Sequence, residues 1–119
     1  MPSVKFVRGA NRVFVGFDSE PGEIAIAKDV DKSVSDTLSC SVVTYERCAF
    51  PYDLPHDEFL YCTSGMLTIE IGDDEYILNP DDCIWLPEGT SVLYRAADKA
   101  TAVCIAYPID WQERQSSNM

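Results

Sequence analysis

Residues 66–89 read MLTIEIGDDEYILNPDDCIWLPEG, and this stretch decides the fold class. Apolar and polar residues alternate over 68–71, which is the period-two pattern of a half-buried β-strand. Turn residues at 72–74 and at 79–82 then separate this run from two further short apolar runs. Short strands that alternate with turns at this spacing are typical of an antiparallel sandwich or barrel.

The same pattern continues on both sides of this stretch. Valine, isoleucine, tyrosine and cysteine dominate the apolar runs, and no long segment keeps a helical period. We expect residues 28–37 to form a polar loop. The sequence therefore predicts an all-β domain with strands at 12–17, 23–27, 38–50, 58–62, 66–71, 75–78, 83–86, 91–96 and 102–107.

The length of 119 residues and the hydrophobic fraction of 46% correspond to one domain with a core of its own. Within this domain, residues 1–37 are expected to supply N-terminal strands and a loop that complete the barrel. Residues 38–111 form the core, and residues 112–119 form a polar tail.

The charge is strongly acidic, with 20 Asp and Glu against 9 Lys and Arg, a formal net charge of −11. No Lys or Arg lies between Arg47 and Arg95. Because nucleic acids and anionic membrane surfaces attract basic patches, we expect neither as a partner.

The chain has five cysteines, and no two of them form a CxxC motif. A secreted disulfide framework favours an even count, so a reducing, cytoplasmic location is expected. No apolar run is long enough to predict a signal peptide or a membrane span.

The chain has one histidine, His56, two residues before Glu58. In an extended strand these two side chains point to the same face, where they form either an acid–base pair or two metal ligands. The alternative is a surface histidine in a polar loop. No P-loop, GxGxxG or GxSxG motif is present, which excludes those nucleotide and nucleophile sites.

Several separate segments together resemble a known family. They are Phe50-Pro51-Tyr52-x-Leu54-x-His56-Asp57-Glu58, then Gly65, then Ile84-x-Leu86-Pro87-x-Gly89, and finally Ala106-Tyr107-Pro108-x-x-Trp111. This pattern resembles the cupin superfamily and, within it, the C-terminal cupin domain of the EutQ family of ethanolamine-utilisation proteins. The resemblance covers about residues 40–112 and implies a double-stranded β-helix, or jelly-roll, barrel.

The resemblance also implies where a metal would bind, and there the chain departs from it. Metal-binding cupins carry a His-x-His before the glutamate and a histidine after P-x-G; here those positions hold residues such as Tyr52, Leu54 and Val92. Only Glu58 remains of the four ligands, so we expect no metal and no other cofactor.

The expected site is a ligand pocket inside the barrel. Its polar residues are predicted to be Tyr52, His56, Glu58, Tyr94 and Glu46, and its walls Cys62, Val92 and Cys104. Glu46 is included because strand parity places it on the same side as Cys48, Phe50 and Tyr52. The acidic surroundings favour a polar or cationic ligand over a multiply anionic one.

Three functions fit these observations. The first is a metal-independent small-molecule binding protein with no catalytic residue. The second is a small-molecule enzyme, either a lyase or isomerase that uses Glu58 and His56, or an acetate kinase, which the EutQ resemblance implies. EutQ-like proteins usually carry a second acid at the position of Leu60, which counts against the kinase. The third is a scaffold protein of a metabolic microcompartment.

The expected partners are an unidentified small molecule and a second copy of the chain. Phe6, Val13, Phe14 and Trp111 lie near the chain ends, where one small core has little room for them. Sheet edges also need covering, so the sequence predicts a homodimer.

Overall fold

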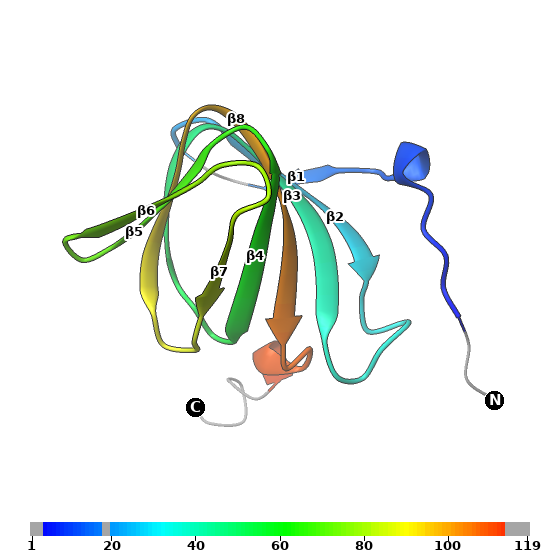
Figure 1. Cartoon of the computed structure of the whole chain (residues 1–119). Coiled ribbons are helices and arrows are strands. Elements are labelled where there is room, and N and C mark those ends of the chain that lie inside the picture. Colours follow the sequence, from blue (N-terminus) through cyan, green and yellow to red (C-terminus); the bar gives the residue numbers. More distant parts are fainter. Residues whose placement is uncertain (1–3, 18–19, 114–119) are drawn as a thin grey trace.

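The structure is a computed structural model that describes residues 4–17 and 20–113, and it confirms the all-β prediction (Figure 1). A short 3₁₀ turn, η1, precedes eight strands. The elements are η1 (Gly9–Asn11), β1 (Val15–Phe17), β2 (Glu23–Val30), β3 (Ser39–Asp53), β4 (Asp57–Ser64), β5 (Leu67–Ile71), β6 (Asp74–Leu78), β7 (Cys83–Leu86) and β8 (Ser91–Tyr107).

All eight strands belong to one antiparallel sheet that curls into a barrel (Figure 1). The order along the main path is β1-β2-β3-β8-β4-β7, and β5 joins it by pairing with β8 on one side and β6 on the other. Strand β8 pairs with β3 from Ser39↔Ala106 to Asp53↔Ser91. Its other edge pairs first with β5 and then with β4. One long strand thus connects both halves of the barrel.

The predicted strands at 91–96 and 102–107 are a single strand in the structure. Residues 97–99 lie between them and are partly polar, so the sequence pattern predicts an end to the strand there. In the structure these three residues are exposed. They contain no glycine or proline, however, and Lys99 keeps its pairing with Glu46. Cross-strand pairing therefore carries the strand through a segment with no buried side chain. In the same way, β2 extends to Val30, into the expected loop 28–37.

A β-bulge interrupts the pairing of β3 with β8 at Arg47. The register shifts between Glu46 and Cys48, and Arg47 has a φ of 49°, in the left-handed region. Such a bulge adds one residue to the strand and reverses the alternation of side chains beyond it. As a result Tyr45 and Cys48, which strand parity would place on opposite faces, are both buried.

The core fills the closed part of the barrel with aliphatic side chains, chief among them Leu60, Leu67, Ile69 and Leu86. Gly65 allows the chain to turn tightly after β4. It has a φ of +74°, and a Cβ atom there would lie 2.0 Å from the carbonyl oxygen of Lys99. Only glycine fits this close approach, which explains why the cupin-like pattern has a glycine at position 65.

The two ends of the described chain differ in how they lie relative to the barrel (Figure 1). The N-terminal segment leaves the barrel, and the segment after β8 forms a helical turn at 111–113 near one end of it. The amide of Ile109 donates to the carbonyl of Thr37 at 2.7 Å and ties this turn to the loop after β2. Within the described residues no helix is long and apolar enough to cross a membrane. Residues 114–119 of the expected tail lie outside the described part.

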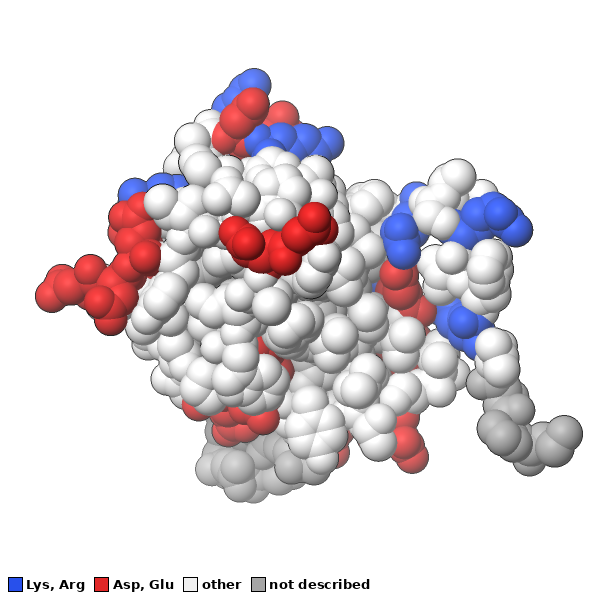
Figure 2. Space-filling view, viewed as in Figure 1, with Lys and Arg blue, Asp and Glu red and all other residues white. Residues whose placement is uncertain are grey.

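Charged side chains are unevenly distributed on the face shown in Figure 2. Acidic side chains gather on the β5–β6 hairpin, and basic ones lie mainly on the N-terminal segment and the upper edge of the barrel. No continuous basic surface spans this face.

Candidate functional site

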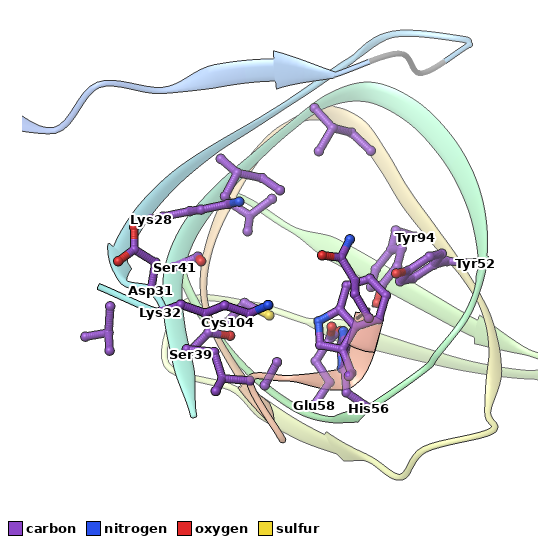
Figure 3. A pocket seen from close by; sticks show the side chains of 18 of the residues that line it. Lys28, Asp31, Lys32, Ser39, Ser41, Tyr52, His56, Glu58, Tyr94 and Cys104 are labelled. Atoms are coloured by element: carbon purple, nitrogen blue, oxygen red, sulfur yellow. Dashed lines mark hydrogen bonds between the residues drawn. The ribbon is translucent and has the colours of Figure 1, made fainter. Parts of the chain in front are cut away.

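The open end of the barrel contains a cavity of about 710 Å³ (Figure 3). Strands β2, β3, β4 and β8 form its walls, and the loop after β2 and the C-terminal turn border it. The lining residues are Ile24, Ile26, Lys28, Val30, Asp31, Lys32, Ser33, Ser39, Ser41, Val43, Tyr45, Phe50, Tyr52, His56, Glu58, Tyr94, Cys104, Ala106, Ile109, Trp111 and Gln112.

Glu58 supplies the buried acid of this cavity. It lies on β4, is 5% exposed, and accepts a hydrogen bond from the Tyr94 hydroxyl at 2.5 Å. Burial raises the pKa of Glu58, while the Tyr94 hydrogen bond and the nearby His56 oppose this rise. Burial and the charge of Glu58 raise the pKa of Tyr94, so this hydroxyl stays protonated and acts as the donor.

His56 precedes β4 and is buried beside Glu58, as the spacing predicts. Its ring meets Trp111 edge-on with 5.4 Å between the ring centres. Its Nδ1 donates to the carbonyl of Asp57 at 3.2 Å, because a carbonyl only accepts. The ring is therefore held between the strand and the C-terminal turn rather than free in a surface loop.

A group of aromatic side chains surrounds the acid. Tyr45 stacks on Tyr94 with 5.7 Å between the ring centres, and Tyr52 lies 6.0 Å from Phe50. Burial raises the pKa of Tyr45 well above its ordinary value and also raises that of Tyr52. Both hydroxyls are therefore neutral hydrogen-bonding groups.

The expected site residues Tyr52, His56, Glu58 and Tyr94 come together, and Glu46 does not join them. Glu46 lies opposite Glu23 on β2 and Lys99 on β8, outside the cavity lining. The Arg47 bulge explains the difference, because it gives the inward position to Tyr45. No glycine marks this bulge in the sequence, so strand parity alone misses Tyr45.

Of the three expected wall residues, only Cys104 lines the cavity. Cys62 and Val92 are buried in the aliphatic core. Burial and the neighbouring Glu58 raise the pKa of the Cys104 thiol well above its usual range, so it remains a neutral thiol.

The wall opposite Glu58 carries groups that the sequence patterns did not indicate. Figure 3 shows Lys28, Lys32, Ser39 and Ser41 on this side, with both lysine amino groups directed toward the cavity. The expectation of a polar or cationic ligand over a multiply anionic one rested on the lack of Lys and Arg between Arg47 and Arg95. Strand β2 and the loop after it bring two lysines to the cavity, together with Asp31.

The side chains present do not suit a transition metal. Within residues 4–17 and 20–113, no group of three or more His, Cys, Asp or Glu side chains is placed to hold an ion. Glu58 and His56 alone fall short of the three or four protein ligands that such ions require.

A barrel of this topology with a site at its open end defines a cupin. Among solved structures, an RmlC-like cupin from Shewanella frigidimarina superposes with a TM-score of 0.72 at 12% identity, covering 91% of this chain and 95% of that one. The jelly-roll prediction is thereby confirmed. The sequence model of the family described as "Ethanolamine utilisation protein EutQ" matches residues 1–113, and the chain belongs to this family.

Individual relatives agree with this assignment. The protein named acetate kinase EutQ from Clostridioides difficile is 27% identical over 112 residues, 93% of this chain and 69% of that protein. A structure of a putative EutQ from Salmonella typhimurium has a TM-score of 0.83 at 21% identity and covers 89% of this chain and 87% of that one. The chain spans about half the length of two longer relatives, from Salmonella typhimurium and Escherichia coli.

Proposed function

We propose that this protein binds a small organic molecule inside the barrel, against Glu58, without a transition metal. The observation that carries the proposal is a cavity of about 710 Å³ with a buried carboxyl and a tyrosine hydroxyl 2.5 Å apart in its wall. Cavities of several hundred Å³ with apolar walls and a few convergent polar groups are typical of small-molecule sites. A scaffold protein needs no such cavity, which makes that alternative weaker.

A location in the cytoplasm accompanies this proposal. All five cysteines are free thiols, including the exposed Cys83. Free thiols persist in reducing compartments, so they support this location.

A second candidate function is acid–base catalysis on the bound molecule. Burial raises the pKa of Glu58, and a carboxyl whose pKa approaches the working pH is suited to give and take protons. His56 lies near it in the same cavity and supplies an imidazole. This candidate requires the same ligand site and adds a reaction to it.

Tryptophan fluorescence tests the binding function directly. Trp111 lines the cavity, whereas Trp85 lies on β7 and is 59% exposed. In a Trp85→Phe background, Trp111 becomes the single reporter for a screen of small acids, alcohols and amines. Glu58→Gln is expected to weaken binding of the best ligand by about 1.5–3 kcal/mol, the scale of a lost hydrogen bond to a charged group.

Glu88→Gln is the matched control, because Glu88 is exposed in the turn before β8. It removes the same charge and is expected to leave binding unchanged. A ligand whose affinity is equal in the Glu58→Gln and Glu88→Gln proteins would place the site elsewhere.

A further inference from the structure

The cavity has two chemically different sides, and their relation indicates which ligand fits between them. Lys28 and Lys32 lie on one side, and Glu58 and Tyr52 on the other (Figure 3). A molecule that touches both sides needs a group of different character at each end.

The lysine side favours an anionic group. Among the described residues, no carboxylate lies within ion-pair distance of Lys28. Lys32 pairs with Glu113 on the C-terminal turn, and the two side chains are 50% and 57% exposed. Ion pairs as exposed as this one are weak and exchange readily with solvent or other ions. The neighbouring Asp31 accepts hydrogen bonds from the amide and hydroxyl of Ser33. The strongest interactions of this carboxylate are therefore within its own turn, and the attraction between it and Lys28 is weaker.

The middle of the cavity favours a flat apolar body. Tyr45, Phe50, Tyr52 and Trp111 present aromatic rings to it, and Ile24 and Val43 complete the wall. Aromatic rings pack well in offset or edge-to-face contact with other rings. A wall of this composition accommodates an aromatic ligand better than a sugar or a short aliphatic acid.

The Glu58 side favours a hydroxyl. Tyr94 donates to Glu58 Oε2, and the Cys104 thiol also hydrogen-bonds this carboxyl. The two oxygens of a carboxylate offer about four acceptor sites, so a further donor still fits. The Tyr52 hydroxyl makes no hydrogen bond to another described side chain or backbone group. A ligand hydroxyl there can donate to the carboxyl and accept from Tyr52.

We propose that the ligand is a hydroxyaryl carboxylate: its carboxylate lies against Lys28 and Lys32, and its hydroxyl lies against Glu58 and Tyr52. This inference rests on the proposed function and narrows its ligand to one chemical class. Because the two lysines are on the surface and Glu58 is buried, the two ends are separable by mutation.

Three matched probes test the two ends in turn by isothermal titration calorimetry. They are para-hydroxyphenylpropionate, its amide, and phenylpropionate, which lacks the hydroxyl. The acid is expected to bind about 5-fold more tightly than the amide, the scale of one good ion pair. It is also expected to bind about 5-fold more tightly than phenylpropionate, the scale of one hydrogen bond. Added salt should weaken binding of the acid and leave binding of the amide unchanged.

The double variant Lys28→Met/Lys32→Met is expected to bind the acid and the amide equally. The matched control is Lys5→Met/Lys99→Met, which removes the same charge from two exposed lysines outside this cavity and should keep the preference. Equal binding of acid and amide to the native protein, with both weakened by Glu58→Gln, would overturn this inference and leave the proposed function standing. Failure of all three probes to bind would also overturn this inference alone, because the fluorescence screen tests the proposed function with other ligands. Binding of the probes that Glu58→Gln does not change would overturn both.

Discussion

The hydroxyl of Tyr94 donates to Glu58 Oε2 at 2.5 Å and joins two parts of the barrel that do not pair with each other. Tyr94 lies in the first half of β8, opposite Phe50 and Ile69, whereas Glu58 on β4 lies opposite Ala106 in the second half. The bond therefore fixes the carboxyl across the cavity. It also favours the ionised form of Glu58 and so partly opposes the rise in pKa that burial causes.

Replacing Tyr94 with Phe removes this bond and leaves the ring in place. We expect the pKa of Glu58 to rise further, because burial then acts without the opposing hydrogen bond. At neutral pH the free energy of unfolding should fall by about 1.5–3 kcal/mol, the scale of a hydrogen bond to a charged group. Carboxyl NMR titration and chemical denaturation measure the two effects. Tyr76→Phe on the exposed β6 is the control, and an equal Glu58 titration in both variants would contradict the prediction.

The pH dependence of stability follows from the raised pKa of Glu58. A carboxyl whose pKa is higher in the folded than in the unfolded protein stabilises the fold while it is protonated. This contribution is complete below the unfolded pKa of about 4.3 and is lost as the pH rises through the folded value. Glu58→Gln removes the titration, so its stability relative to the native protein should increase over this range.

Denaturation of the native and Glu58→Gln proteins across the acidic range isolates this effect, because all other carboxyls are common to both. Glu88→Gln serves again as the matched control and should run parallel to the native curve. A native-minus-variant difference that is constant with pH would mean that Glu58 titrates as it does in the unfolded chain.

The fold was predictable from sequence because its signals are local. Alternation over 68–71 and the turn at Gly72 gave the β5–β6 hairpin, which pairs Ile71 with Asp74. The break expected at 97–99 was wrong, because pairing with β3 holds that segment in the sheet. Pairing between distant strands is not visible in a local pattern.

The site was predictable only in part, for the same reason. His56 and Glu58 are two residues apart, and period-two spacing correctly predicts that both side chains face the cavity. Tyr45 depends on a bulge at Arg47, a residue type that gives no sign of its positive φ. Lys28 reaches the cavity because β2 pairs with β3 from Glu23 onward, a long-range relation. Local patterns thus predict the side of the cavity that contains Glu58 and miss the side that contains the lysines.

The purified protein is expected to contain no stoichiometric transition metal. Among the residues that the structure describes, no three His, Cys, Asp or Glu side chains are placed to share an ion, and fewer ligands give weak binding. Elemental analysis should show far less than one Zn, Mn, Fe or Ni per chain, and a chelator should not change the melting temperature. About one metal ion per chain that resists brief chelation would contradict this.

The protein is expected to be a homodimer that uses its N-terminal segment. Val4, Phe6 and Val13 are 95%, 75% and 77% exposed, and an isolated chain gains nothing from such exposure. Trp111, expected to take part, lines the cavity instead and is left out of this prediction. Light scattering should give about twice the mass of 13.3 kDa.

Val13→Asp should dissociate this dimer, since it places a charge in the apolar contact. Val34→Asp is the control, because Val34 is also exposed but lies in the loop after β2. A native protein with the mass of one chain at micromolar concentration would show that the exposed N-terminal residues have another role.

Leu60 decides the expected outcome of an acetate kinase assay. It is fully buried, pairs with Ile84 and Cys104, and belongs to the aliphatic core. Strand β4 therefore carries Glu58 but no second acid at position 60. Phosphoryl transfer from ATP needs carboxylates to hold Mg²⁺ as well as positive charge for the phosphates. Lys28 and Lys32 supply the charge, but no acid pair supplies the metal ligands.

We therefore expect no acetyl phosphate from ATP, Mg²⁺ and acetate, although relatives of this chain carry the name acetate kinase. Phosphorus NMR follows the product directly, with an authentic acetate kinase as the positive control. Glu58→Gln is the informative variant, because a Leu60→Asp change would bury a charge in the core and unfold it. Acetyl phosphate that forms with the native chain and disappears with Glu58→Gln would show that Glu58 is required and that a second acid at position 60 is not. It would also make the cavity an active site for phosphoryl transfer rather than a binding site alone.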